Sequence, residues 1–265
     1  MPSVFCRRQI MQEEQTLIEA KELGLQIFRR TPFWDVSLKV EPHQIVAISG
    51  EHGSGKSALL LALSGYMKFT NGTLTIADAT LPNDFKESRK YVGLGLFNGI
   101  NEFYKMQTIE EALMSELKLA SSSPLFREQY KNDVKNREAL RQYAYNLLAQ
   151  WKVFSPHKTA IGELTPCERM RLAIALALLK QPWLLFVDGI ETELTSEQRE
   201  CLLSDIREYV SKNYCSCLVG VLQSELEKQA DQVLRLMPNN EKTENSHTDS
   251  QLATSEANGG ENNAR

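Results

Sequence analysis

The 265-residue sequence lacks a segment that could cross a membrane unaided. Its longest apolar stretches, Leu172 to Leu179 and Trp183 to Val187, are separated by a Lys-Gln-Pro break, whereas a spanning helix needs about 20 consecutive apolar residues. The first 15 residues also contain no apolar core of the length found in signal peptides. We therefore expect a cytoplasmic location, with any membrane role coming through a partner protein.

The sequence contains few cysteines and has a small net charge. The net charge is −4, from 30 basic and 34 acidic residues, which gives no broad attraction to nucleic acid, so no nucleic-acid partner is expected. The five cysteines form no CxxC pair and are odd in number, which fits a reducing compartment. Cys215 and Cys217 flank Ser216, but two thiols do not build a four-ligand metal site.

What the chain does have is an α/β pattern. Residues Leu23 to Ile48 alternate in polarity, with turns expected at Arg29 to Pro32 and Glu41 to His43, and end in the apolar run IVAIS. TNGTLTI then reads as a turn and a strand, and Gln107 to Phe154 has helical spacing. Further on, helices alternate with the short apolar runs PWLLFVD and CLVGVL, which predicts a parallel sheet covered on both faces.

These patterns divide the chain into three parts. We expect a flexible N-terminus over residues 1–15 and one domain over residues 16–238, with a helical subdomain at about 99–165. Residues 239–265 are rich in Asn, Glu, Ser, Thr and Gly and lack aromatic residues, which predicts a disordered tail.

The strongest local signal is a phosphate-loop motif, G-x-x-x-x-G-K-[ST], placed between an apolar strand and an apolar helix. It consists of Gly50, Glu51, His52, Gly53, Ser54, Gly55, Lys56 and Ser57, and the helix continues with Ala58. Its glycines let backbone N–H groups converge on phosphate, Lys56 can reach the β- and γ-phosphates, and Ser57 can ligate Mg²⁺. The motif predicts a nucleoside triphosphate as ligand. The alternative is a glycine-rich turn that carries a lysine, and Glu51 and His52 can equally be solvated loop residues.

A second carboxylate motif brings in a family resemblance. Asp188 ends the apolar run PWLLFVD, where a carboxylate can reach Mg²⁺ through water. The preceding LTPCERMRLAIALALLKQP resembles the LSGGQ signature and its helix in ATP-binding-cassette (ABC) nucleotide-binding domains. The resemblance extends from about Leu23 to Leu236.

The resemblance implies a P-loop NTPase fold with a mainly parallel core sheet, an antiparallel β subdomain and an inserted helical subdomain. It implies ATP and Mg²⁺ as ligands and a role as the ATP-binding subunit of an ABC transporter or a related membrane complex. Subunits of this family pair face to face around two nucleotides. Their helical subdomain docks on a membrane permease, which would hold the chain at the inner face of the membrane.

Several positions depart from the family pattern. Gly189 stands where the family has the glutamate that polarises the attacking water, and Gln223 stands where it has a histidine near the γ-phosphate. Asn98 takes the place of a glutamine that contacts Mg²⁺. Glu191 and Glu193 follow Gly189, but surface positions before the next helix are the preferred interpretation. Hydrolysis is therefore expected to be slow at best.

The signature-like segment is altered too. The family binds the γ-phosphate of the opposite subunit's ATP there through a serine and two glycines, whereas this chain has Pro166, which lacks an N–H, and Cys167, which adds a side chain. The segment still reads as a helix start, with Thr165 as N-cap, Pro166 at N1 and Glu168 completing a capping box. Thr195, where the family has an aspartate, likewise reads as a helix cap. Pairing with an intact ABC ATPase subunit is therefore expected to be easier than homodimer formation.

Two questions stay open at this point. Phe28 is the candidate for stacking on adenine, with Phe33 and Trp34 as alternatives, and core packing is the competing interpretation for all three. The alternative function is that of a non-hydrolysing, nucleotide-dependent adaptor in which ATP selects one conformation or partner. An unrelated phosphate-loop kinase is a third reading, disfavoured by the signature-like segment.

Overall fold

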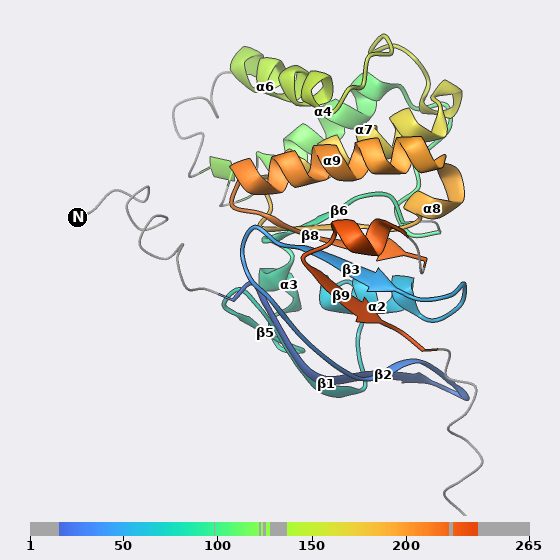
Figure 1. The fold of residues 1–265 in the computed structure, drawn as a ribbon. Helices are drawn as coiled ribbons and strands as arrows, with labels where there is room; N and C mark the ends of the chain where they lie inside the picture. The colour runs from blue at the N-terminus through green and yellow to red at the C-terminus, as the bar shows by residue number, and fades with distance from the viewer. Residues whose placement is uncertain are drawn as a thin grey trace, which may run out of the picture.

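Two sheets with helices between and above them make up the fold in a computed structural model (Figure 1). The structure describes residues 16–97, 99–121, 123, 126–127, 137–222 and 225–237. The expected flexible N-terminus and disordered tail lie outside these residues. No helix within the described ranges is long and apolar enough to cross a membrane.

The first sheet is antiparallel and has the strand order β2-β1-β4-β5. Its strands are β1 (Ile18–Ile27), β2 (Arg30–Val40), β4 (Asn71–Ile76) and β5 (Ala79–Leu81). The short helix α3 (Phe85–Ser88) follows β5. One face of this sheet packs on α2 (Lys56–Leu63), whose residues Leu59 to Leu63 are all buried. The apolar alternation of the sequence therefore becomes the inner face of this sheet.

The second sheet is parallel throughout and has the order β6-β7-β8-β3-β9. Its strands are β3 (Ile45–Ser49), β6 (Val92–Leu94), β7 (Leu184–Val187), β8 (Ser216–Val221) and β9 (Gln232–Arg235). Every residue of β3, β7 and β8 is buried, because helices cover both faces. The expected parallel sheet is confirmed.

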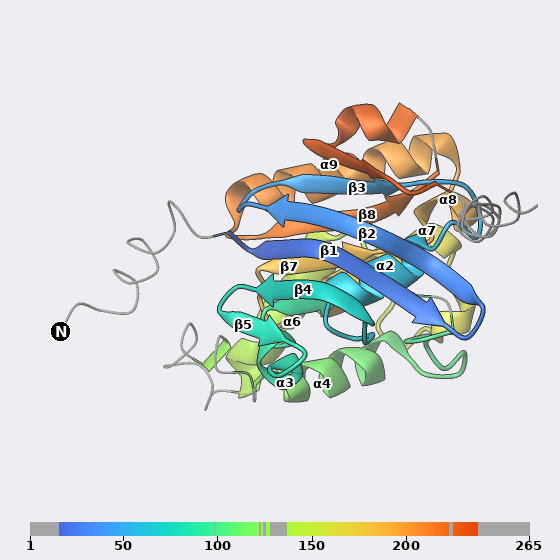
Figure 2. The ribbon, with the colours of Figure 1, turned by 90° about the horizontal axis from the view of Figure 1, so that it is seen from below.

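Helix α2 lies between the two sheets, α3 lies beside β5, and another set of helices lies on the opposite side of the parallel sheet (Figures 1 and 2). They are α4 (Ile109–Ala120), α6 (Arg137–Gln150), α7 (Pro166–Leu178), α8 (Ile190–Glu193) and α9 (Ser196–Lys212). The described residues also form the 3-10 turns η1 (Ile161–Glu163) and η2 (Glu225–Gln229). Helices α4 and α6 fall where a helical subdomain was expected, although its boundaries at 99–165 stay a prediction.

The first turn differs from expectation. Residues 30–32 belong to β2, so the hairpin turns at Phe28 and Arg29 rather than over Arg29 to Pro32. Phe28 has a left-handed φ of 52°, which lets a two-residue turn close the pairing between Ile27 and Arg30. The sequence alternation did not reveal this turn because register shifts interrupt it between Ala20 and Ile27.

Candidate functional site

The phosphate loop connects the buried strand β3 to helix α2 along a backbone path that only glycine accommodates. Gly53 and Gly55 have left-handed φ values of 80° and 94°. A Cβ on Gly55 would lie 2.0 Å from the carbonyl oxygen of Pro32 in β2, whereas a Cβ on Gly53 would meet nothing within 4 Å. The first sheet therefore presses on the loop at Gly55, and Gly53 faces open space.

Lys56 begins α2 and folds back over the loop. Its Nζ donates hydrogen bonds to the carbonyl oxygens of Gly50 and Glu51, each at 2.7 Å. Burial lowers the pKa of Lys56, and Asp188 and Glu191 partly offset this effect. The Ser54 hydroxyl is buried and has no hydrogen-bond partner among the described residues. An open cradle, a cation at its rim and an unsatisfied buried hydroxyl fit a phosphate group.

A cavity of about 480 Å³ opens beside this loop. It lies where the carboxyl ends of β3, β7 and β8 meet, since these strands are parallel neighbours. Its lining from the loop and α2 includes His52, Gly53, Gly55, Lys56, Ser57, Ala58 and Leu61. The rest comes from Met67, Phe97 and Ile100, from Asp188, Gly189, Glu191 and Thr192 after β7, and from Gly220, Val221 and Leu222 at β8.

Asp188 lies in this cavity at the end of β7, as the second motif requires. A Cβ on Gly220 would lie 2.5 Å from its Oδ1, so the carboxylate rests directly against the backbone of β8. Ser57 lines the same cavity. One hydroxyl and one carboxylate suit Mg²⁺, which keeps several waters and is completed by substrate phosphates. Within the described residues no group of three or more His, Cys, Asp or Glu could hold a metal alone.

Glu191 is the residue that the sequence analysis misjudged. We expected a surface position, but Glu191 lines the cavity and its Oε2 accepts a hydrogen bond from the backbone N–H of Leu222. Glu193, for which a surface position was also expected, is partly exposed, and its Oε2 lies 3.0 Å from Nη2 of Arg169. Only the position of Glu191 three residues after Asp188 could have indicated its location.

The other predicted site residues fall into three groups. Gly189 lines the cavity and starts α8 with a left-handed φ of 70°. Asn98 and Gln223 lie outside the described residues. Phe28 is at the tip of the β1–β2 hairpin with 96% of its surface exposed, which excludes core packing, while Phe33 is buried. Phe28 is not among the described residues that line the cavity.

The signature-like segment forms the start of α7 but only part of the expected cap. The Thr165 hydroxyl accepts from the Glu168 N–H, and Pro166 occupies the first turn, as predicted. The capping box with Glu168 was wrong. Its carboxylate instead accepts from the N–H groups of Phe154 and Ser155 and from the Ser155 hydroxyl, at 2.8 to 3.0 Å. Thr195 caps α9 with a full capping box formed with Gln198.

Cys215 and Cys217 lie fully inside the protein at the start of β8. Burial raises the pKa of the Cys215 thiol to about 12 and that of Cys217 well above its usual value. Both are therefore apolar packing residues at neutral pH.

Comparisons with known proteins agree with this arrangement. The family model described as "ABC transporter" matches residues 33–191. The energy-coupling factor transporter ATP-binding protein EcfA2 of Lactobacillus gasseri is 26% identical over 231 residues, covering 83% of this chain and 75% of the relative. The phosphonates import ATP-binding protein PhnC of Treponema denticola is 25% identical over 215 residues, covering 78% and 80%.

Solved structures show the same fold at lower identity. A bacterial ABC transporter cassette, solved as a dimer, superposes with a TM-score of 0.69 at 18% identity, covering 83% of this chain and 94% of the cassette. A second cassette, in its ADP conformation, gives 0.67 at 17% identity over 85% and 89%. This chain belongs to the ABC transporter family and has the fold of its ATP-binding cassettes.

Proposed function

We propose that this chain is the ATP-binding subunit of an ABC transporter or a related membrane complex, and that it binds Mg-ATP but hydrolyses it slowly. The observation that carries the proposal is the cradle itself, in which Lys56, Ser57 and Asp188 line one cavity beside an open glycine loop. The names of EcfA2 and PhnC describe those relatives as ATP-binding proteins of transporters, which supports the same role here.

Each residue of the cradle has a defined task in binding. Lys56 exchanges the carbonyl oxygens of Gly50 and Glu51 for phosphate oxygens, and the backbone N–H groups of the loop and α2 receive the β-phosphate. Ser57 and, through water, Asp188 would hold Mg²⁺. When bound, the ion would neutralise part of the negative charge of the phosphates. Phe28, exposed at the hairpin tip, is our candidate for the adenine contact.

Slow hydrolysis follows from what surrounds the cradle. Gly189 has no side chain to take a proton from water. Pro166 and Cys167 occupy the segment that would have to offer bare backbone to a partner's ATP, and Cys167 packs against the core. The loss of one transition-state hydrogen-bond donor commonly costs about 2.7 to 4 kcal/mol of activation free energy.

Ligand-dependent stability tests the proposal. At 100 times the Kd, Mg-ATP is expected to stabilise the fold by about 2.7 kcal/mol, and Lys56→Ala is expected to remove most of this gain. Lys39→Ala is the control, because Lys39 is an exposed lysine of β2 that pairs with the nearby Glu41 and does not line this cavity among the described residues. A thermal shift absent with ATP, or the same in Lys56→Ala and wild type, would contradict ATP binding at this loop.

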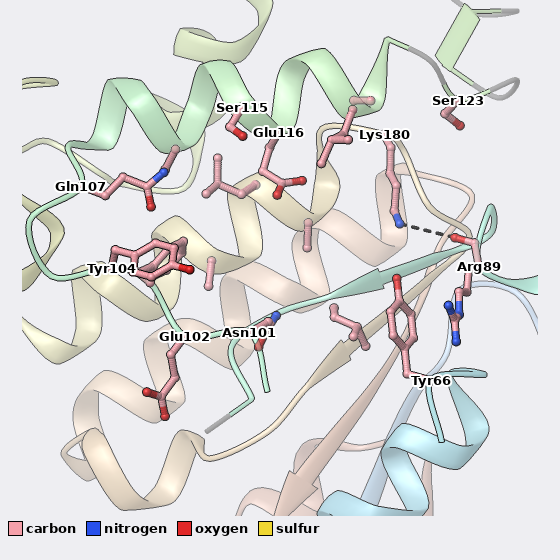
Figure 3. Close-up of a pocket in the computed structure, with 18 of the residues that line it drawn as sticks. Tyr66, Arg89, Asn101, Glu102, Tyr104, Gln107, Ser115, Glu116, Ser123 and Lys180 are labelled. Carbon is pink, nitrogen blue, oxygen red and sulfur yellow. Dashed lines mark hydrogen bonds between the residues drawn. The ribbon is translucent and has the colours of Figure 1, made fainter. Parts of the chain in front are cut away.

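A groove beside α4 supports a permease as partner, and with it a peripheral position at the cytoplasmic face of the membrane. The groove has a volume of about 610 Å³ and is lined by Glu116 of α4 and, across from it, by Arg89 and Lys180 (Figure 3). Tyr104 on its rim is 82% exposed. Opposite charges and an exposed aromatic ring suit a protein segment of mixed polarity. Co-purification with a candidate permease, weakened by Tyr104→Ala, is the test.

The altered signature supports pairing with an intact ABC ATPase subunit rather than with itself. Such a partner could close its own glycine-rich signature over the ATP held by Lys56 and Ser57. Sedimentation with non-hydrolysable ATP is expected to show a monomer for this chain alone and a heterodimer with the intact subunit. A tight, ATP-dependent homodimer would mean that Pro166 and Cys167 are tolerated at the interface.

A further inference from the structure

The cavity beside the phosphate loop contains two carboxylates among the described residues that line it, Asp188 and Glu191. They are not equivalent. The Asp188 carboxylate lies against Gly220 of β8, and Asp188 is the carboxylate proposed above to hold Mg²⁺ through water. Glu191 belongs to α8 and lies three residues after Asp188 in the chain. A proton acceptor for water, if it is a carboxylate of this lining, is therefore Glu191.

The local backbone explains why Glu191 faces the cavity. Gly189 adopts a left-handed φ of 70° and starts α8 immediately after Asp188. Leu222, which follows β8, donates its N–H to Oε2 of Glu191. The backbone carbonyl of Glu191 also accepts from Nη1 of Arg199 at 3.4 Å. Glu191 is thus held at both its backbone and its side chain, toward the ends of β7 and β8.

Glu193 provides an internal comparison on the same short helix. Its carboxylate forms an ion pair with Arg169 of α7 at 3.0 Å, and it lines a different cavity, with Phe103 and Lys105. Two glutamates two residues apart therefore point to different surroundings, and only Glu191 shares a cavity with Lys56.

We propose that Glu191 is the catalytic base for the slow hydrolysis of ATP, in place of the side chain missing at Gly189. The proposal rests on the proposed function, since it requires ATP at the phosphate loop. Water oxygen forms a bond to the γ-phosphorus while the bond from that phosphorus to the bridging oxygen breaks. The water proton passes to Glu191, and ADP leaves with the bridging electron pair.

Glu191→Gln is the decisive variant, because its amide oxygen still accepts from the Leu222 N–H while it no longer accepts a proton from water. Single-turnover hydrolysis with excess protein is expected to fall about 100-fold or more, the usual contribution of a general base. The thermal shift with Mg-ATP is expected to persist. Glu193→Gln is the matched control and is expected to leave both measurements unchanged.

A second variant guards against loss of local structure. Glu191→Ala removes the carboxylate, and added formate is expected to restore part of its turnover but none of that of Glu191→Gln, where the amide fills the space.

Each alternative outcome overturns a different claim. Wild-type turnover no higher than that of Lys56→Ala, with the Mg-ATP thermal shift intact, rejects Glu191 as a base and leaves ATP binding standing. Equal turnover in wild type and Glu191→Gln also rejects it. Absence of the thermal shift in the wild type rejects the proposed function itself.

Discussion

The phosphate loop and the start of α7 are both glycine-rich in the family that this chain resembles, yet they differ sharply here. In the phosphate loop, Gly55 is held between its left-handed conformation and the Pro32 carbonyl, so the fold itself demands glycine. At the start of α7, Thr165 caps the helix through its hydroxyl and Pro166 occupies the first turn, so these residues serve the helix start. In the phosphate loop, folding requires the same glycines that phosphate binding would use. At the start of α7, folding is served by Thr165 and Pro166, whereas binding a partner's ATP would require glycine.

The largest expected effect tests whether the phosphate loop is a folding element. Gly55→Ala places a Cβ 2.0 Å from the Pro32 carbonyl oxygen at a φ of 94°, so we expect a loss of at least about 3 kcal/mol in the free energy of unfolding. Gly53→Ala has a similar φ but open space, and is expected to lose only about 1 kcal/mol. Urea denaturation measures both. Equal losses would show that the contact with β2 does not constrain the loop.

Helix α7 is anchored to α9 by an ion pair that involves no ligand. Asp205 of α9 accepts from Nη1 of Arg171 at 2.6 Å and from Nζ of Lys152 at 2.8 Å. The Arg171 side chain is 6% exposed and that of Asp205 17%. Asp205→Asn is therefore expected to cost about 2 kcal/mol, between the values for a surface pair and a buried pair. Glu208→Gln, which breaks an exposed pair on the same helix, should change stability by less than about 0.5 kcal/mol.

The same pair predicts a pH dependence. Burial alone would raise the pKa of Asp205, but the hydrogen bonds from Lys152 and Arg171 outweigh it and lower the pKa. A lowered pKa in the folded state means that the stabilisation is fully present above the unfolded pKa of about 3.9 and is lost as pH falls through the folded value. The difference between wild type and Asp205→Asn should therefore be constant from pH 5 to 7, about 1 to 3 units above that unfolded value, and shrink below it. A difference that grows toward acid would contradict the assignment.

The smallest expected effect tests whether the start of α7 contributes to stability without contributing to ATP binding by the same chain. Thr165→Ala removes the hydroxyl that accepts from the Glu168 N–H and is expected to lower the free energy of unfolding by about 1 kcal/mol. Thr165→Ser keeps the hydroxyl and should have little effect. The stabilisation by Mg-ATP should be the same in all three proteins, because no described residue of α7 lines the cavity beside the phosphate loop. A smaller stabilisation by Mg-ATP in Thr165→Ala than in wild type would show that the start of α7 also affects ATP binding by the same chain.

Several elements followed from the sequence because their causes are local. The strand IVAIS, the loop and the helix from Lys56 appear in the expected order, and Thr165 and Thr195 cap helices as predicted. A cap depends on residues three positions apart, which the sequence displays directly. The apolar runs of β7 and β8 were equally legible, since a buried parallel strand is apolar on both faces.

Other contacts depended on residues distant in the chain. Glu168 has the spacing of a capping-box residue, but Ser155 and Phe154 offer it three donors, and they reach it through the loop that precedes η1. Phe28 lies exposed on a turn at residues 28 and 29, whereas the sequence predicted a turn over residues 29 to 32. For Glu168, donors from a distant loop took the place of the local capping box.

The sequence by itself determined the family, the phosphate loop and the alternation of helices with buried strands, because glycine spacing, caps and hydrophobic runs act over a few residues. Only the tertiary structure decided that Glu191 enters the cavity with Lys56 while Glu193 turns to Arg169. The two glutamates have the same side chain and nearly the same position in the chain. They differ because Glu191 accepts a hydrogen bond from Leu222, which follows β8, whereas Glu193 pairs with Arg169 of α7, and no pattern within residues 188–195 indicates those neighbours.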